Sequence, residues 1–141
     1  MAVKNTCTDR SNSAKVSKVS EVSSDRVRAK RIYEPASPED GTRILVMRLW
    51  PRGIRKDRVT LWLRELAPVL PLMRAFRSGQ MGWTDYRRQY LAGLKRAEAR
   101  DHVERAIALA RSGPVTVLCG CDDETRCHRS LLRRYLAERL L

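Results

Sequence analysis

The sequence predicts an α/β fold: a single small domain in which flanking helices cover a short, mostly parallel sheet, preceded by a disordered basic tail. Three observations predict this fold. The chain has 141 residues, 43% of them apolar and 32% charged, which suffices for one hydrophobic core but not for two. Two short apolar runs, Ile44–Met47 and Val115–Leu118, are uninterrupted, as in strands covered on both faces. Helical periodicity occupies much of the chain between these runs and the segment after the second one.

Residues 1–29 are expected to form the tail. They contain six serines and no aromatic residue, proline or glycine, so they offer too little apolar surface to order themselves. Six Lys/Arg minus three Asp/Glu give this segment a charge of +3 out of the total of +13. Most of the positive charge therefore belongs to the ordered domain, which is expected to span residues 30–141.

The first two strands are predicted from apolar and β-branched segments. Val27–Tyr33 is the first candidate strand, and the polar turn Pro35–Gly41 follows it. Arg43–Leu49 is the second and stronger candidate. It ends at Trp50-Pro51-Arg52-Gly53, where proline cannot donate a sheet hydrogen bond and glycine permits a turn.

Helical patterns follow the second strand. Asp57 is the expected N-cap of a first helix, which stops before Pro68. Leu70–Phe76 is the expected second helix. Thr84 is the expected cap of a third helix, which either breaks before the helical segment Glu98–Arg111 or continues into it as one bent rod.

The chain ends in a strand, a loop and a helix, and the loop holds the reactive side chains. Between the strand Val115–Leu118 and an amphipathic helix over Ser130–Leu141, the segment Cys119–Arg129 contains three cysteines, a histidine and two arginines. Parallel sheets bind ligands at the carboxyl ends of their strands. This loop and the Trp50–Gly53 turn are therefore expected to meet at the same edge of the sheet.

Two stretches also resemble a known family. The segment Arg43–Gly53, followed by Trp62–Pro68 and Trp83–Tyr90, is similar to the YeaO-like bacterial proteins of the domain-of-unknown-function family numbered 488. The resemblance covers about residues 30–141 and implies that family's fold, whereas the family brings no established activity. The departures from the family pattern are Met47 in place of an aspartate, Val69 in place of a serine and Gly93 in place of a glutamate. No acid–base role is carried over to these positions.

The Cys/His/Arg loop favours the binding of a small anionic or nucleotide-like ligand. Backbone N–H groups ahead of a helix are free to bind an anion, and arginines add forked donors. The expected ligand-binding residues are Arg48, Trp50, Arg52, Gly53, Cys119, Cys121, Arg126 and Arg129.

In the enzymatic version of this hypothesis, Cys127 and His128 are the catalytic residues. A thiol in the first turn of a helix, beside Arg126 and Arg129, has its pKa lowered by the helix dipole and by the cations. It is then a nucleophile, and His128 supplies acid–base or nucleophilic chemistry. The alternative is that Cys127 fills the seam between helix and sheet as a small apolar residue.

No metal and no other cofactor are expected, although one alternative stays open. By count, Cys119, Cys121, Cys127 and His128 suffice for one tetrahedral zinc ion. However, the C-x-C spacing lacks the two-residue knuckle of common zinc sites. In addition, the side chains of two adjacent helical residues, Cys127 and His128, diverge by about 100°.

The competing function is a non-enzymatic protein that binds nucleic acid, because a charge of +13 favours anionic partners. Basic residues of the predicted helices would contact phosphates, with Trp83 and Tyr86 nearby to stack on bases. These basic residues are Arg87, Arg88, Lys95, Arg96, Arg100, Arg133 and Arg134. The alternative is that they form an ordinary solvated surface.

The location is predicted from what the sequence lacks. No apolar stretch approaches the roughly 18 residues of a membrane span, and the start has no apolar core of a secretory signal. We therefore expect a cytoplasmic protein without membrane contact, whose four cysteines are thiols or ligands rather than disulfides. The sequence does not indicate the oligomeric state.

Overall fold

A computed structural model describes residues 26–140. In this range the chain forms a four-stranded sheet in the order β1-β4-β2-β3, and all three neighbouring pairs are parallel. The parallel α/β fold predicted from the sequence is confirmed, as is the pairing of the terminal strand with the strand of Ile44. The strands are β1 (Val27–Arg31), β2 (Thr42–Leu45), β3 (Leu61–Trp62) and β4 (Val115–Cys119).

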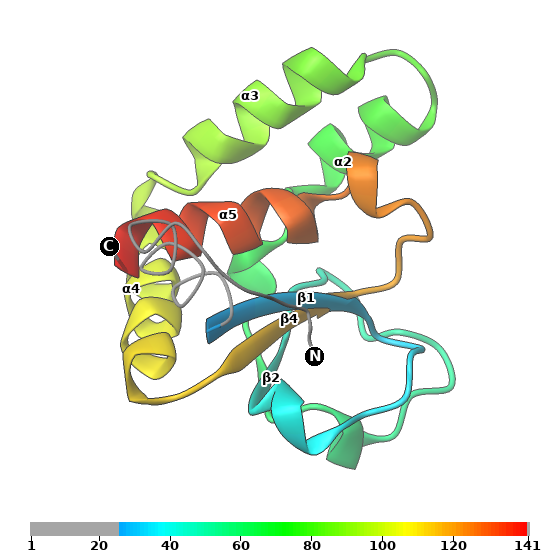
Figure 1. Cartoon of the computed structure of the whole chain (residues 1–141). Helices are drawn as coiled ribbons and strands as arrows, with labels where there is room; N and C mark the ends of the chain where they lie inside the picture. Colours follow the sequence, from blue (N-terminus) through cyan, green and yellow to red (C-terminus); the bar gives the residue numbers. More distant parts are fainter. Residues whose placement is uncertain (1–25, 141) are drawn as a thin grey trace, which may run out of the picture.

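The α-helices lie on one side of this sheet, and connecting segments that include the 3-10 turns Pro38–Asp40 and Lys56–Arg58 cover the other side (Figure 1). No helix of residues 26–140 is long and apolar enough to cross a membrane. The α-helices are α2 (Leu70–Arg77), α3 (Trp83–Gly93), α4 (Ala97–Ser112) and α5 (His128–Leu140). The 3-10 turns are η1 (Pro38–Asp40), η2 (Lys56–Arg58), η3 (Arg64–Leu66) and η4 (Glu124–Arg126).

The central strand β4 is buried along its whole length and separates two clusters of apolar side chains. Val117 belongs to the larger cluster, together with Leu132 and Leu136 of α5. Leu118 points to the opposite face and packs with Leu45. This alternation explains the uninterrupted apolar runs in the sequence, because a strand with both faces covered needs apolar residues at successive positions.

The helix predicted from Asp57 to Pro68 is wrong. These residues form η2, the short strand β3 and η3 instead. Leu61 and Trp62 pair with Ile44 and Leu45 in the sheet, and Trp62 Nε1 donates a hydrogen bond of 2.7 Å to the Met47 carbonyl. The apolar spacing of this segment fits a helix, but Leu61 and Trp62 adopt a strand because they pair with the free edge of β2. Tertiary contacts often override local preference in this way.

The remaining boundaries differ from prediction by a few residues. β1 begins at Val27, so the sheet starts three residues upstream of the expected domain boundary at residue 30. Most of the predicted tail, residues 1–25, lies outside the described residues. The helices α3 and α4 are separate, with Leu94 to Arg96 between them. The helix α2 was predicted correctly, and α5 begins at His128 rather than at Ser130.

The helix α5 holds the first residues after the Cys/His/Arg loop over the sheet. It contacts β1 and β4 on one side and α3 and α4 on the other. Leu132 and Leu136 are both fully buried and hold the helix against the sheet. As a result, the first turn of α5 lies beside the carboxyl end of β2, where the Nε2 atom of His128 meets the carbonyl oxygen of Val46.

Candidate functional site

The loop after β4 brings three cysteines and a histidine together. Cys119 is the last residue of β4, and Cys127 follows η4 directly before α5. Cys127 has an extended backbone (φ −133°, ψ 143°), so it is not part of the helix. The predicted divergence of Cys127 and His128 is therefore wrong. Their ligand atoms and those of Cys119 and Cys121 all lie within 4.8 Å of one another.

Arg129 lies at the centre of the thiol cluster. Its Nη1 donates to Cys119 Sγ at 3.2 Å and to the Cys121 carbonyl at 2.8 Å, and it lies 3.7 Å from Cys127 Sγ. The residue is only 3% exposed and forms no ion pair with a carboxylate among residues 26–140. A buried guanidinium stays charged and is stabilised by a counter-charge, and the groups beside Arg129 within residues 26–140 that can carry one are the cysteine thiols.

A thiolate in this cluster is favoured on Cys119 rather than on Cys127. The two Sγ atoms are 2.9 Å apart, and either can donate the hydrogen bond between them. Hydrogen bonds from the Cys121 and Cys127 thiols, together with Arg129, lower the pKa of Cys119. The hydrogen bond with Cys119, then the one with Cys121, and burial all raise the pKa of Cys127. Sequence reasoning placed the lowered pKa on Cys127, because it assumed that Cys127 lies in the first turn of the helix. In the structure the helix begins at the next residue, His128.

His128 is neutral and has a defined tautomer. Its Nε2 lies 2.6 Å from the Val46 carbonyl, which can only accept, so Nε2 carries the proton. Burial lowers the pKa of His128, which is 4% exposed. The Nδ1 lone pair is left facing Cys127 Sγ at 3.9 Å. The imidazole can therefore act as a base or as a metal ligand at Nδ1.

The Trp50–Gly53 turn lies at the same edge of the sheet, but two of its expected binding residues hold the fold together. Arg48 donates to the carbonyls of Ala67 and Pro68 at 3.1 and 3.3 Å. Trp50 Nε1 donates to Ile54 at 2.8 Å, and its ring packs edge-on against Trp62. The side chains of Arg48 and Trp50 are thus engaged by backbone carbonyls and, for Trp50, by packing against Trp62.

The other predicted residues of this edge are accessible. Arg52, Gly53 and Arg126 are exposed. Tyr33 connects the two segments, because its hydroxyl donates to the Arg52 carbonyl at 3.2 Å and its ring lies beside Gly120. The turn and the Cys/His/Arg loop therefore meet through Tyr33, and the guanidinium of Arg52 donates no hydrogen bond to the thiols.

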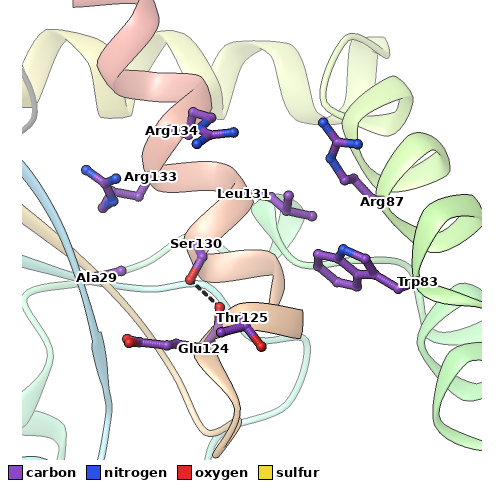
Figure 2. A pocket seen from close by; sticks show the side chains of 9 residues that line it. All are labelled: Ala29, Trp83, Arg87, Glu124, Thr125, Ser130, Leu131, Arg133 and Arg134. Atoms are coloured by element: carbon purple, nitrogen blue, oxygen red, sulfur yellow. Dashed lines mark hydrogen bonds between the residues drawn. The ribbon is translucent and has the colours of Figure 1, made fainter. Parts of the chain in front are cut away.

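Sequence reasoning missed a groove on the outer side of the same loop (Figure 2). It has a volume of about 560 Å³ and lies between α3, α5, η4 and β1. Arg134 of α5 and Arg87 of α3 point toward each other across it, with Trp83 below Arg87. The lining residues are Ala29, Trp83, Arg87, Glu124, Thr125, Ser130, Leu131, Arg133 and Arg134. The sequence did name four of them as part of a basic surface, but nothing in it showed that helices far apart in the chain would face one another.

Comparison with known proteins identifies the family. A family model described as DUF488-N3a, the active DUF488-N3 subclade, matches residues 27–140. The chain is 38% identical over 112 residues to the uncharacterized protein YeaO of Escherichia coli K12, covering 78% of this chain and 96% of that protein. It is 32% identical over 113 residues to the uncharacterized proteins Mb3100c of Mycobacterium bovis and Rv3073c of Mycobacterium tuberculosis, covering 79% of this chain and 93% of each.

No solved structure matches the chain significantly, so the comparisons rest on sequence. The family match spans every strand and helix described above, from β1 to α5. The resemblance seen in Arg43–Gly53, Trp62–Pro68 and Trp83–Tyr90 is thereby confirmed. The chain belongs to the DUF488 family and is a YeaO-like member of it.

Proposed function

We propose that this protein binds a small anionic ligand with a planar ring, such as a nucleotide, in the groove between α3 and α5. The observation that carries the proposal is that three arginines and a tryptophan line one groove together with a single carboxylate, that of Glu124. Its volume of about 560 Å³ lies within the range of small-molecule sites, roughly 300–1,000 Å³.

The three arginines are free to bind a ligand. Among residues 26–140, Arg87, Arg133 and Arg134 form no ion pair and donate no side-chain hydrogen bond within the chain. This distinguishes them from Arg48 and Arg129, whose side chains donate hydrogen bonds to carbonyl and sulfur atoms. A guanidinium presents paired N–H donors that match two oxygens of a phosphate.

Trp83 would supply the surface for the planar ring. Its indole is half-buried and is held by Phe76 and Tyr86, with ring centroids 5.8 and 5.7 Å away. An aromatic side chain fixed on one face by other rings loses little conformational entropy when a base stacks on its free face. The ligand expected from these groups therefore combines a phosphate with a base.

Chemical transformation of the ligand is the enzymatic extension of this proposal, with Cys127 and His128 as the catalytic residues. The matching family model is described as an active subclade, which supports the extension. Cys127 is 1% exposed and lies on the core side of the loop whose outer side, at Glu124 and Thr125, lines the groove. The extension therefore requires η4 to move away from α5 when the ligand binds.

Single-stranded nucleic acid is a second candidate, favoured by the same arginines and by the total charge of +13. A polymer would extend beyond the groove and contact further basic residues of α3 and α4. Its affinity would then fall steeply with salt, in proportion to the number of phosphates contacted. A single nucleotide would show a shallow salt dependence.

The test is calorimetric titration of the full chain with nucleotides, the corresponding nucleosides and inorganic phosphate. We expect nucleotides to bind more tightly than either part alone, and the double variant Arg87→Ala/Arg134→Ala to lose more than about tenfold in affinity, since each lost charged hydrogen bond is worth about 1.5–3 kcal/mol. Arg88→Ala is the matched control, because Arg88 lies on the same helix and pairs with Asp85 at 3.0 Å. Equal losses in both variants, or no nucleotide binding, would contradict the proposal.

An oligonucleotide titration at several salt concentrations decides between the two candidates. A steep salt dependence that Arg88→Ala also weakens would favour the polymer over the nucleotide. A shallow dependence confined to the groove variants would favour the nucleotide.

A further inference from the structure

We infer that Cys119, Cys121, Cys127 and His128 form a closed tetrahedral site for one zinc-class metal ion, with Arg129 as its charge-balancing neighbour. The site uses none of the residues that line the nucleotide groove. It takes Cys127 and His128 as metal ligands, so it stands in place of the enzymatic extension in which these two residues are catalytic.

The convergence of four donors is the first support. One Sγ from each of three cysteines and a ring nitrogen of His128 lie within 4.8 Å of one another. Three thiolates and one imidazole are a common ligand set of structural zinc. The convergence depends on local backbone, because Cys127 is extended and His128 begins α5, so their side chains can turn to the same point.

His128 has the tautomer that a metal ligand needs. Its Nε2–H donates to the Val46 carbonyl at 2.6 Å, which fixes the ring and leaves the lone pair on Nδ1. That Nδ1 faces the cysteines, 3.9 Å from Cys127 Sγ. Zinc-bound histidines usually donate their second ring N–H to a carbonyl or carboxylate in this way.

Charge is the third support. A divalent ion with three thiolates and a neutral imidazole carries a net charge of −1, and the buried guanidinium of Arg129 cancels it. Arg129 already donates to Cys119 Sγ at 3.2 Å and approaches Cys127 Sγ at 3.7 Å. Without a metal, one guanidinium faces three sulfurs that cannot all be ionised, because like charges at this separation repel.

Binding requires only a small adjustment of side chains. Zinc–sulfur bonds of about 2.3 Å in a tetrahedron place the sulfurs about 3.8 Å apart. The Cys119 and Cys127 Sγ atoms, now 2.9 Å apart, must therefore separate by about 0.9 Å. Because all four ligands come from the protein, the ion would hold the Gly120–Arg126 loop to β4 and α5 rather than carry an open catalytic position.

The experiment measures metal content and ligand type in the full chain. Protein purified without chelator and without added metal is analysed for zinc per chain by mass spectrometry, and metal-free reduced protein is titrated with Co²⁺. We expect about one zinc per chain, the visible absorption bands of tetrahedral Co²⁺, and the sulfur-to-cobalt charge-transfer band of thiolate ligands.

Two matched variants locate the site. Cys121→Ser removes the half-exposed ligand and should keep the fold, while weakening metal binding by more than the roughly tenfold loss that removal of an outer-shell partner causes. Cys7→Ser removes the one cysteine of the chain that is not a proposed ligand, and it should leave metal binding unchanged. If Cys121→Ser fails to fold, the charge-transfer band of the wild-type Co²⁺ complex still decides.

Three results would overturn the inference. The first is a fresh reduced protein with free thiols that binds neither zinc nor Co²⁺. The second is a Cys119–Cys127 disulfide found by peptide mapping in protein isolated without reductant. The third is a Co²⁺ complex that lacks the thiolate charge-transfer band, or whose affinity Cys7→Ser lowers as much as Cys121→Ser does.

Discussion

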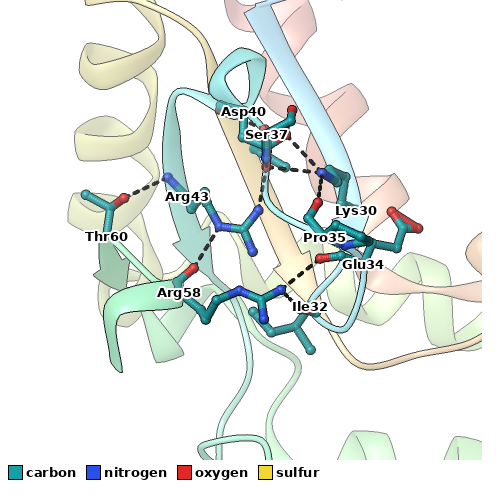
Figure 3. Close-up of polar contacts among 10 residues, drawn as sticks. Lys30, Ile32, Glu34, Pro35, Ser37, Asp40, Arg43, Arg58 and Thr60 are labelled. Carbon is teal, nitrogen blue, oxygen red and sulfur yellow. Dashed lines mark hydrogen bonds and ion pairs between the residues drawn. The ribbon is translucent and has the colours of Figure 1, made fainter. Parts of the chain in front are cut away.

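Two arginines are buried on opposite sides of the sheet, and their partners differ. Arg43 of β2, 7% exposed, pairs with the Asp40 carboxylate and donates through Nε to the Arg58 carbonyl at 2.7 Å. Asp40 also accepts from Lys30 Nζ at 3.1 Å and from the Ser37 amide at 3.0 Å (Figure 3). Arg129, on the helix side, meets sulfur atoms and one carbonyl instead.

The difference lies in whether the counter-charge can be removed. Asp40 is a carboxylate, ionised near neutral pH, and its two cationic partners, Lys30 and Arg43, pair with it permanently. The groups that can supply a counter-charge to Arg129 are thiols, which are charged only when deprotonated and which also react with metals and electrophiles. A buried arginine thus belongs to a structural ion pair at Arg43 and to a cluster of reactive thiols at Arg129.

The largest effect should come from breaking the carboxylate network. Asp40→Asn leaves Arg43 buried without a counter-charge, and such losses cost about 3–5 kcal/mol. The free energy of unfolding of the full chain, measured in urea, should fall by this amount. Asp85→Asn is the control, because its pair with Arg88 is exposed and should be worth less than about 1 kcal/mol. A small loss in Asp40→Asn would mean that Arg43 finds another partner.

An intermediate effect is expected for Arg129→Met in metal-free reduced protein. The thiolate can accept a proton when the cation is gone, so only hydrogen bonds and packing are lost, about 1–3 kcal/mol. At the same time the pKa of Cys119 should rise, and the ultraviolet absorbance of the thiolate should disappear at neutral pH. Arg129→Lys keeps the charge and should retain part of that absorbance. A loss of stability as large as that of Asp40→Asn would break the contrast between the two regions.

The sequence predicted the sheet well because the signals of its central strands are local. The uninterrupted apolar run of β4, with Gly113-Pro114 before it, needs no knowledge of neighbours. The strand β3 was mistaken for part of a helix, since only two residues pair and their preference for the sheet comes from the free edge of β2.

The candidate site could be predicted in composition but not in geometry. The Cys/His/Arg loop stands out in the sequence, yet whether its donors converge depends on the backbone of Cys127, one residue ahead of α5. The Asp40 network was missed, because Lys30, Asp40 and Arg43 come from three segments and look like ordinary surface charges. The groove required the packing of α3 against α5, which no local pattern specifies.

The smallest effect, and the sharpest test of the contrast, is the response of stability to acid. Burial alone would raise the pKa of Asp40, but hydrogen bonds from the Ser37 amide, Lys30 and Arg43 outweigh it and lower the pKa. Because the folded pKa lies below the unfolded value of about 3.9, the contribution of Asp40 is fully present above that pH. It is lost as the pH falls through the folded pKa, with a slope of at most about 1.4 kcal/mol per pH unit.

Urea unfolding at a series of pH values from about 6 down to 3 measures this slope. Arg129→Met should lose the share of the slope that Cys119 supplies, because the pKa of this thiol is lowered in the folded protein and has an ordinary value in the unfolded chain. Asp40→Asn should lose the share of the slope that its carboxylate supplies, while exposed acids continue to contribute in both variants. The double variant should lose the sum of the two shares, because the two groups lie on opposite sides of the sheet. A loss that departs from this sum would mean that the two buried arginines are coupled through the sheet, and that the carboxylate network is not the separate structural unit that its contacts describe.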